Sequence, residues 1–597
     1  MRNTTATAVS IAGLCLATSS LASVADWDNP ADIPVIEPVS VGLAGEKPAD
    51  IVRYLLANGA GESRPAPDGS RVAFEWSITG EPQLWIVAAA GGAPRQITFG
   101  DAITLFRWAP GGEHLLVGRD VDGNGREGYY LISADGTEEM ELLSRSDAFR
   151  QFGTFSTDGD RIIYSSTERN GTDFDIYVLD VATSQRRQLV QTRFGFYPRA
   201  WQPQGDIVIV AETRGEAAND VHLLDVSTGQ LTPLFGPDDA ALYENFAWLP
   251  DGSGFFMATN EGREFAGLAY YSLATEKLEY VRKADFDVAN VVLSGDGRYL
   301  AWTTNEDGYH RLFVHDREQE RDVETPELPR GTYDIGFSRA ASVLSVRISG
   351  PSAPGDVWTW DLASGAVANP VRSSLGGLSP DDFAVPLSLR FAARDGVTLH
   401  GFLYLPDAQR YGGKPPLVVN VHGGPTAQAQ PDFTAVIQYL VNRGIAVFDV
   451  NVRGSTGFGK TFTRLDNQEK RLDSVRDLVD TMAFLNRDGR VDTDRAAVMG
   501  GSYGGYMVNA VLGLYPGLFD AGISRVGVSD WVRALQDASP SLKASDRLEY
   551  GDIREERWQE FYAENSPINN AAKINVPVLV QHGANDPQDP VAESDRL

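Results

Sequence analysis

Residues 496–506 read AAVMGGSYGGY, and this stretch decides the fold of the second half of the chain. The apolar run from Ala496 to Met499 predicts a buried strand, and the apolar run from Met507 to Leu514 predicts a helix. Between them, glycines on both sides of Ser502 let the two backbones approach across a tight turn. The pattern therefore predicts a strand–turn–helix unit in which Ser502 projects at the carboxyl edge of a sheet.

Gly-x-Ser-x-Gly in this context is typical of a nucleophile elbow, the turn that presents the reactive serine of an α/β-hydrolase. Taken alone, the motif could also be a glycine-rich turn after a strand. Its surroundings favour the hydrolase, because apolar strands over 416–421 and 445–450 alternate with helical patterns over 432–442 and 474–486. Such alternation predicts a parallel sheet covered on both faces. Residues 387–404 add a predicted hairpin.

The loop His422-Gly423-Gly424-Pro425 closes an earlier strand, where an α/β-hydrolase places its oxyanion donors. We expect the backbone N–H groups of Gly424 and Tyr503 to stabilise a developing oxyanion. His422 is expected to order this loop and not to act as the base.

The predicted acid is Asp586, which ends a strand-end loop after the apolar residues 576–581. In these hydrolases the chain order is serine, then acid, then histidine. None of the seven histidines follows Asp586, and His582, which precedes it, is expected to be structural. We therefore expect a C-terminally truncated hydrolase domain that lacks its last strand and helix and its catalytic histidine. Residues 1–597 alone are expected to fold poorly and to be inactive.

The first half of the chain repeats a turn every 43 to 47 residues. The turns are Pro67-Asp68-Gly69, Pro110-Gly111-Gly112, Thr157-Asp158-Gly159, Pro203-Gln204-Gly205, Pro250-Asp251-Gly252, Gly295-Asp296-Gly297 and, in degenerate form, Arg339-Ala340-Ala341. β-rich runs follow each turn, and a period in the forties with several short strands suits a propeller blade. Seven repeats predict a seven-bladed β-propeller over residues 50–375, followed by the α/β-hydrolase domain over 376–597. A β-solenoid or a sandwich is the alternative.

The composition describes a globular protein with a formal net charge of −29 over 597 residues. Such a surface repels phosphate backbones and anionic lipid, which argues against nucleic-acid partners. Residues 120–127 invite a calcium interpretation, but the twelfth loop position is Leu131 and not a glutamate. A polar hairpin tip explains them more simply, so we predict neither a metal nor a cofactor.

The first 25 residues resemble a signal peptide, with Arg2, a short apolar core from Ile11 to Ala17, and small residues before a cut. The apolar run is too short to span a bilayer comfortably, so no membrane insertion is expected after its removal. Cys15, the only cysteine, lies inside this segment. These features predict export to a periplasm or to the medium, with residues 26–49 as an N-terminal extension.

The combined motifs resemble the prolyl oligopeptidase family of serine peptidases, in its acylaminoacyl-peptidase or dipeptidyl-peptidase-like branch. The resemblance runs from about residue 50 to Leu597 and is carried by four segments: 422–425, 451–459, 500–506, and Ser566-Pro567 leading into 576–586. One departure from the dipeptidyl-peptidase pattern is Tyr243-Glu244-Asn245, which holds one acid where paired glutamates would be expected.

The resemblance implies a secreted serine exopeptidase or oligopeptidase that hydrolyses short peptides through an acyl-enzyme on Ser502, with the propeller as a size filter. It also implies Asp586 as the triad acid, and Gly424 and Tyr503 as oxyanion donors. Two alternatives stay open: a non-catalytic propeller binding protein with a relic hydrolase domain, and an esterase. The sequence leaves open the preference for the residue before the scissile bond, the length of the released product and the oligomeric state.

Overall fold

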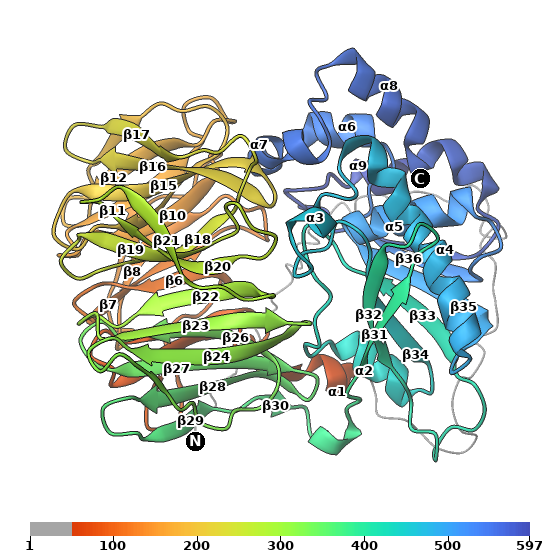
Figure 1. Ribbon diagram of the computed structural model, residues 1–597, viewed down its shortest axis with the longest axis horizontal. Coiled ribbons are helices and arrows are strands. Elements are labelled where there is room, and N and C mark those ends of the chain that lie inside the picture. Colours follow the sequence, from red (N-terminus) through yellow and green to blue (C-terminus); the bar gives the residue numbers. More distant parts are fainter. Residues whose placement is uncertain (1–50) are drawn as a thin grey trace, which may run out of the picture. The chain divides into compact units, whose positions relative to one another are not determined.

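A computed structural model describes residues 51–597 of this protein. Seven four-stranded antiparallel sheets come first in the chain, and a seven-stranded mixed sheet follows them (Figure 1). The predicted fold class, a seven-bladed β-propeller followed by an α/β-hydrolase fold, is confirmed. The predicted signal peptide over 1–25 and the extension over 26–49 lie outside the described residues.

Each blade is built from four strands that are consecutive in the chain. The first four blades are β2 (Ser63–Pro65), β3 (Arg71–Trp76), β4 (Gln83–Ala88) and β5 (Arg95–Gln96); β6 (Ile103–Trp108), β7 (His114–Arg119), β8 (Gly128–Ser133) and β9 (Glu139–Leu143); β10 (Arg150–Phe155), β11 (Arg161–Ser166), β12 (Asp175–Asp180) and β13 (Arg186–Val190); and β14 (Phe196–Trp201), β15 (Ile207–Gly215), β16 (Ala218–Asp225) and β17 (Gln230–Phe235). The last three are β18 (Tyr243–Trp248), β19 (Gly254–Thr259), β20 (Gly267–Ser272) and β21 (Lys277–Arg282); β22 (Asp287–Leu293), β23 (Tyr299–Glu306), β24 (Tyr309–Asp316) and β25 (Arg321–Val323); and β26 (Thr332–Phe337), β27 (Val343–Gly350), β28 (Ala353–Asp361) and β29 (Val367–Val371). The short strands β1 (Ala57–Asn58) and β30 (Ser374–Leu375) pair where the chain enters and leaves the propeller.

The repeated turns bring neighbouring blades into contact. A Cβ on Gly112 would lie 3.3 Å from Cδ of Pro67, and one on Gly159 would lie 3.2 Å from Cδ of Pro110. Both glycines also have positive φ, 78° and 83°. A glycine therefore serves twice at these positions, since it forms the turn and makes room for the proline of the preceding blade.

The mixed sheet has the strand order β31-β32-β34-β33-β35-β36-β37. Its strands are β31 (Leu387–Ala392), β32 (Thr398–Tyr404), β33 (Pro416–Val421), β34 (Ala446–Asn451), β35 (Asp492–Gly501), β36 (Ala521–Arg525) and β37 (Val578–Gln581). Strands β31 and β32 form the predicted hairpin and join the sheet antiparallel. The other five strands, β33 through β37, run parallel to one another. The predicted parallel sheet therefore holds for five of these seven strands, because the hairpin extends the same sheet.

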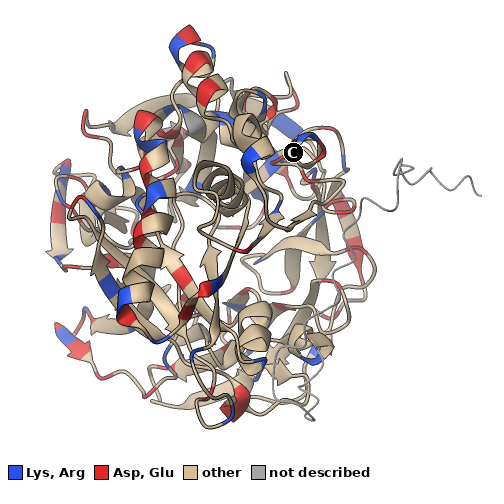
Figure 2. Cartoon of the chain, turned by 90° about the vertical axis from the view of Figure 1, so that its right-hand side faces the viewer, with Lys and Arg blue, Asp and Glu red and all other residues tan. Residues whose placement is uncertain are grey.

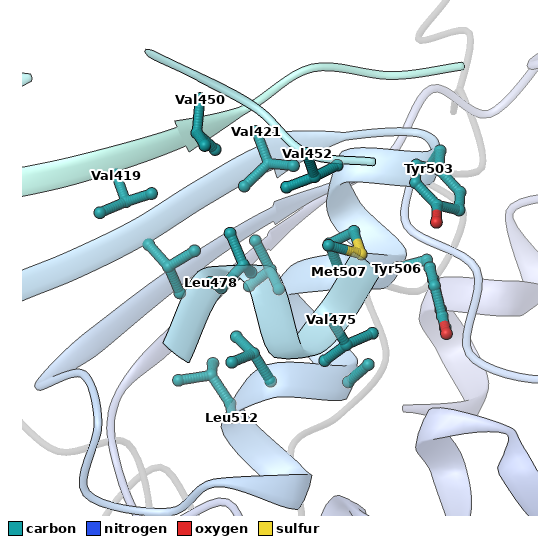
Figure 3. Packing of buried hydrophobic residues seen from close by; sticks show 14 of the residues in the cluster. Val419, Val421, Val450, Val452, Val475, Leu478, Tyr503, Tyr506, Met507 and Leu512 are labelled. Carbon is teal, nitrogen blue, oxygen red and sulfur yellow. The ribbon is translucent and has the colours of Figure 1, made fainter. Parts of the chain in front are cut away.

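The helices of the chain are α1 (Ile51–Leu55), α2 (Ala435–Asn442), α3 (Lys460–Thr463), α4 (Arg471–Asp488), α5 (Tyr503–Leu514), α6 (Trp531–Asp537), α7 (Pro540–Glu549), α8 (Glu556–Asn565) and α9 (Ala592–Arg596), with 3₁₀ turns at Pro380–Asp382, Gln468–Lys470 and Pro567–Lys573. Valines of β33 and β34 pack against Leu478 of α4 and against Met507 and Leu512 of α5 (Figure 3). This core fixes α5 beneath the sheet and so fixes the turn at its N-terminus.

Acidic and basic residues are interspersed along the helices that face the viewer in Figure 2. Within residues 51–597, no helix has both the length and the apolar character that crossing a bilayer requires.

Candidate active site

Ser502 occupies the turn between β35 and α5 in a strained backbone conformation. Its φ is 53° and its ψ is −121°, a combination that non-glycine residues rarely adopt. The surrounding glycines are required by contact: a Cβ on Gly500 would lie 2.5 Å from the carbonyl of Gly504, and one on Gly504 would lie 2.1 Å from the carbonyl oxygen of Val421. The turn therefore has the strained, closely packed geometry of a nucleophile elbow.

The loop after β33 lies beside this turn. A Cβ on Gly423 would be 3.4 Å from Cβ of Ser502, and Gly424, at φ 121°, lines the same cavity as Ser502 and Tyr503. His422 supports the loop, since Nε2 bonds to Oγ of Ser455 at 2.8 Å and Nδ1 bonds to the Gly423 carbonyl at 2.7 Å. Gly424 and Tyr503 thus flank the nucleophile, and Tyr503 does so as the first residue of α5, where N–H groups point outward from the helix end.

The carboxylate in contact with the nucleophile is that of Asp589. Oγ of Ser502 donates to Oδ2 of Asp589 at 3.2 Å, and burial raises the pKa of Asp589 to about 6. Asp586 adds to this increase through its charge, while the bond from Ser502 opposes it. Asp586 itself accepts the backbone N–H groups of Gln588 and Asp589, at 2.9 and 3.1 Å, and so shapes the loop. The sequence analysis did not single out Asp589, although it lies three residues after the predicted acid.

The two histidines in the loops around Ser502, His422 and His582, both use their ring nitrogens in hydrogen bonds to groups other than the nucleophile. His582 bonds through Nδ1 to Oγ of Ser594 at 2.7 Å and through Nε2 to the carbonyl of Asp589 at 2.8 Å. His422 is engaged as described above. Within residues 51–597, therefore, neither of these two imidazoles bonds to Oγ of Ser502.

A cavity of about 170 Å³ opens beside Ser502. Its apolar wall includes Val528, Trp531 and Leu535, and Trp531 is held edge-on against Tyr506 with ring centroids 4.8 Å apart. A pocket of this size and lining suits one apolar side chain. The sequence carried no signal for it, because α6 and the loop before it meet the elbow only in the tertiary structure.

Below the elbow, the Tyr503 hydroxyl belongs to a buried polar network. It bonds to Oγ of Ser474 at 2.7 Å and donates to Asp466 at 3.3 Å. Arg471 forms ion pairs with Asp466 and, at 2.9 Å, with Glu549. Burial nevertheless raises the pKa of Asp466 to about 6 and that of Glu549 to about 8. The network holds the side chain of Tyr503 in place and thereby orients its backbone N–H.

One residue of the propeller reaches the site. Glu216, in the turn between β15 and β16, accepts hydrogen bonds from the hydroxyl and the backbone N–H of Thr426, in the loop that follows Gly424. Glu216 lines the cavity beside Ser502 and also two larger cavities, of about 740 and 340 Å³, on the propeller side. The nucleophile thus faces a space enclosed by both halves of the chain.

No group of three or more His, Cys, Asp or Glu side chains in the part of the chain that the structure describes is arranged to hold a metal ion. At 120–127, Asp120 accepts the backbone N–H of Gly125 at 2.7 Å within the hairpin between β7 and β8.

Comparisons with known proteins agree with this architecture. The prolyl oligopeptidase family profile matches residues 431–597, and the TolB β-propeller domain profile matches residues 54–230. The chain is 34% identical to dipeptidyl peptidase family member 6 of Caenorhabditis elegans over 84% of this chain and 74% of that protein. It is 27% identical to dipeptidyl aminopeptidase BIII of Pseudoxanthomonas mexicana over 89% and 80% of the two chains.

Solved structures share the fold. A puromycin hydrolase superposes with a TM-score of 0.80 at 19% identity, over 94% of this chain and 91% of that one. A puromycin-hydrolyzing peptidase of Mycobacterium tuberculosis gives 0.79 at 20% identity, over 94% and 90% of the two chains. Together, the elbow, the propeller and these relatives define the class as serine peptidases with a β-propeller. The chain belongs to the prolyl oligopeptidase family.

Proposed function

We propose that this protein hydrolyses short peptides through an acyl-enzyme on Ser502. In the first step, Oγ of Ser502 bonds to the peptide carbonyl carbon while its proton passes to a base and then to the leaving amine as the C–N bond breaks. In the second step, water attacks the ester carbonyl carbon and its proton passes to the base and then to Oγ of Ser502, as the C–O bond of the ester breaks and the peptide acid leaves. The N–H groups of Gly424 and Tyr503 would stabilise the oxyanion in both steps. The strained turn at Ser502 is the observation that carries the proposal.

The base in this mechanism would be a histidine that follows Asp586 in chain order, with Asp586 orienting it. The sequence through Leu597 contains none after Asp586. Reading the gene beyond the codon for Leu597 tests this directly: a frame that continues into a loop histidine is expected. A stop codon at that position would favour the non-catalytic binding protein.

The substrate proposed for the site is a short peptide with a small apolar residue before the scissile bond. The cavity of about 170 Å³ limits the size of that side chain, and its wall of Val528 and Trp531 favours an apolar one. The carboxylates of Glu216 and Glu244 on the propeller side favour a free N-terminal amine. Enclosure by the propeller would exclude folded proteins and so act as the size filter.

Covalent labelling with a fluorophosphonate tests the nucleophile. We expect the chain that carries the histidine to be labelled, and Ser502→Ala to lose both labelling and peptide turnover. Ser364→Ala, at an exposed turn of the propeller, is a serine control that should keep both. Retained turnover in the Ser502→Ala variant would overturn the assignment. A marked preference for esters over peptides would instead indicate an esterase.

We also propose that the protein is exported, with cleavage after the small residues near position 25. N-terminal sequencing of the protein recovered from the periplasm or medium tests this. A mature chain that still begins at Met1 would contradict it.

A further inference from the structure

A cavity on the propeller side of the site contains an arginine. This cavity of about 740 Å³ is lined by strands of blades 4 and 5 and by residues of α7, among them Arg199, Glu244 and Leu542. Arg199 lies on β14, and its side chain remains accessible to water within the cavity. Among residues 51–597, Arg199 is the only Lys or Arg that lines this cavity.

Arg199 stands apart from its neighbours because its guanidinium has no polar partner. In the described part of the chain it forms no hydrogen bond and no ion pair, and its nearest ring, Tyr197, lies 5.6 Å away. By contrast, the Tyr243 hydroxyl donates to Glu261 at 2.8 Å, and the Asn219 amide accepts from the backbone N–H of Tyr243 at 3.0 Å. Burial lowers the pKa of Arg199, and the negative charge of Glu244 opposes that decrease.

A cavity-lining guanidinium whose N–H groups have no protein acceptor can donate charge-assisted hydrogen bonds to a bound anion. The cavity adjoins the catalytic pocket, because Glu216 and Leu542 line both spaces. A peptide held at Ser502 can therefore extend into the space that contains Arg199.

We propose that Arg199 binds a carboxylate of the peptide substrate and so determines specificity. The guanidinium offers two parallel N–H donors, which match the geometry of a carboxylate. That carboxylate is either the free C-terminus of the peptide or an acidic side chain. The proposal rests on the proposed function, since it takes the occupant of the cavity to be a peptide.

Glu244 limits how much negative charge the cavity accepts. It faces the same space and acts electrostatically on Arg199, although the two side chains form no ion pair. A ligand with one carboxylate and one amine would compensate both charges, whereas a ligand with several carboxylates would be repelled. We therefore expect short zwitterionic peptides and not polyacidic ones.

The test measures binding, which does not depend on turnover. Peptides of three to four residues with a free amine are titrated calorimetrically into the full chain carrying Ser502→Ala, which keeps them intact. Three forms are compared: a neutral peptide with a free C-terminal carboxylate, its C-terminal amide, and the amide with one glutamate side chain. The same series is repeated with Arg199→Gln, with Arg199→Lys, and with Arg311→Gln, a control that removes an exposed arginine of β24.

We expect Arg199→Gln to weaken binding of at least one carboxylate-bearing form about tenfold or more and to change binding of the simple C-terminal amide less than twofold. The weakened form identifies the source of the carboxylate. Arg199→Lys should retain part of the affinity, and Arg311→Gln should change none of it. Equal effects of Arg199→Gln on all three forms, no effect, or no binding to the Ser502→Ala chain would each overturn the proposal.

Failure of the proposed function gives a different result. If carboxylate recognition by Arg199 is found but Ser502 is not labelled by a fluorophosphonate in the chain that carries the histidine, the cavity binds peptides without hydrolysing them. If Ser502 is labelled and peptides are cleaved while the substitution at Arg199 leaves peptide binding unchanged, the catalytic assignment stands. The proposal that Arg199 binds the carboxylate is then wrong.

Discussion

Arg471 is fully buried beneath the elbow and contacts two carboxyl groups at once. Its side chain is 1% exposed, and its partners Asp466 and Glu549 are 0% and 4% exposed. Removing one member of such a buried group leaves the remaining charges without compensation, which costs far more than the intact group contributes. The stability of the folded protein therefore depends on keeping all three members of this network.

Arg471→Met should lower the free energy of unfolding by about 3–5 kcal/mol, measured by urea denaturation. The matched control is Arg476→Met on the same helix, whose side chain is 48% exposed and pairs with Asp473. That variant should change stability by less than about 0.5 kcal/mol, because an exposed ion pair is screened by water. Similar losses in the two variants would contradict the structural role given to Arg471.

Asp449 is a second residue whose charge is disfavoured by burial. Burial raises its pKa to about 7, the negative charge of Asp432 adds to the increase, and a hydrogen bond from Asn420 at 2.8 Å opposes it. The folded protein therefore holds this proton at pH values where the unfolded chain has released it. The stabilising contribution is present below the unfolded pKa near 4 and is lost as the pH rises through about 7.

Asp449→Asn should remove this dependence, since an asparagine can accept the same hydrogen bond and does not ionise. We expect the loss of stability of the wild type between pH 4.5 and pH 8 to exceed that of the variant by at most about 4 kcal/mol. Urea midpoints at both pH values measure the difference. Identical pH profiles would show that Asp449 does not titrate in this range.

At the scale of elements, the site depends on how closely β35 and α5 approach. Gly504 faces the carbonyl of Val421 with no room for a side chain, whereas a Cβ on Gly501 would meet nothing closer than 3.8 Å. Two glycines in one motif thus have different roles: Gly504 is required for packing, and Gly501 is not.

Gly504→Ala should lower stability by about 1–3 kcal/mol and abolish fluorophosphonate labelling of Ser502, because the helix must move away from β33. Gly501→Ala should keep the melting temperature and the labelling close to wild type. Thermal melts and labelling of the two variants in parallel give the comparison. A tolerated Gly504→Ala would mean that the elbow is less tightly packed than the structure indicates.

At the scale of the whole molecule, residues 51–597 are joined across the two domains by polar contacts near α3. Asp239 pairs with Lys460 at 2.5 Å and with Arg464 at 2.7 Å, and Glu264 accepts the backbone N–H of Thr461 at 2.7 Å. Asp239 is 62% exposed and Arg464 is 40% exposed, although Lys460 is only 13% exposed. These pairs therefore hold the domains together weakly and are open to screening by salt.

The double variant Asp239→Asn, Glu264→Gln should accelerate amide hydrogen exchange in α3 about two- to fivefold, because local opening becomes easier. High salt should produce a similar acceleration in the wild type. Glu324→Gln, at an exposed position of the propeller, should leave exchange in α3 unchanged. Slow exchange in the double variant would show that packing, and not these charges, holds the interface.

Much of this protein was determined by the sequence alone, because its main signals are local. Turn glycines at a period in the forties predicted the blades, and Gly500, Ser502 and Gly504 predicted the elbow, since tight turns and close backbone approach leave few alternatives to glycine. The fold class followed from these patterns. The role of Gly424 as an oxyanion donor stays a prediction.

Only the tertiary structure decided which side chains share the active-site space. Asp589 against Ser502, Glu216 against Thr426 and Arg199 in the propeller cavity come from segments hundreds of residues apart or from the details of one loop. No local pattern encodes such contacts, because each depends on how two separately folded surfaces meet. Strand and helix formation depends mainly on residues close together in the sequence. The charges that face a substrate are instead brought together by packing between domains.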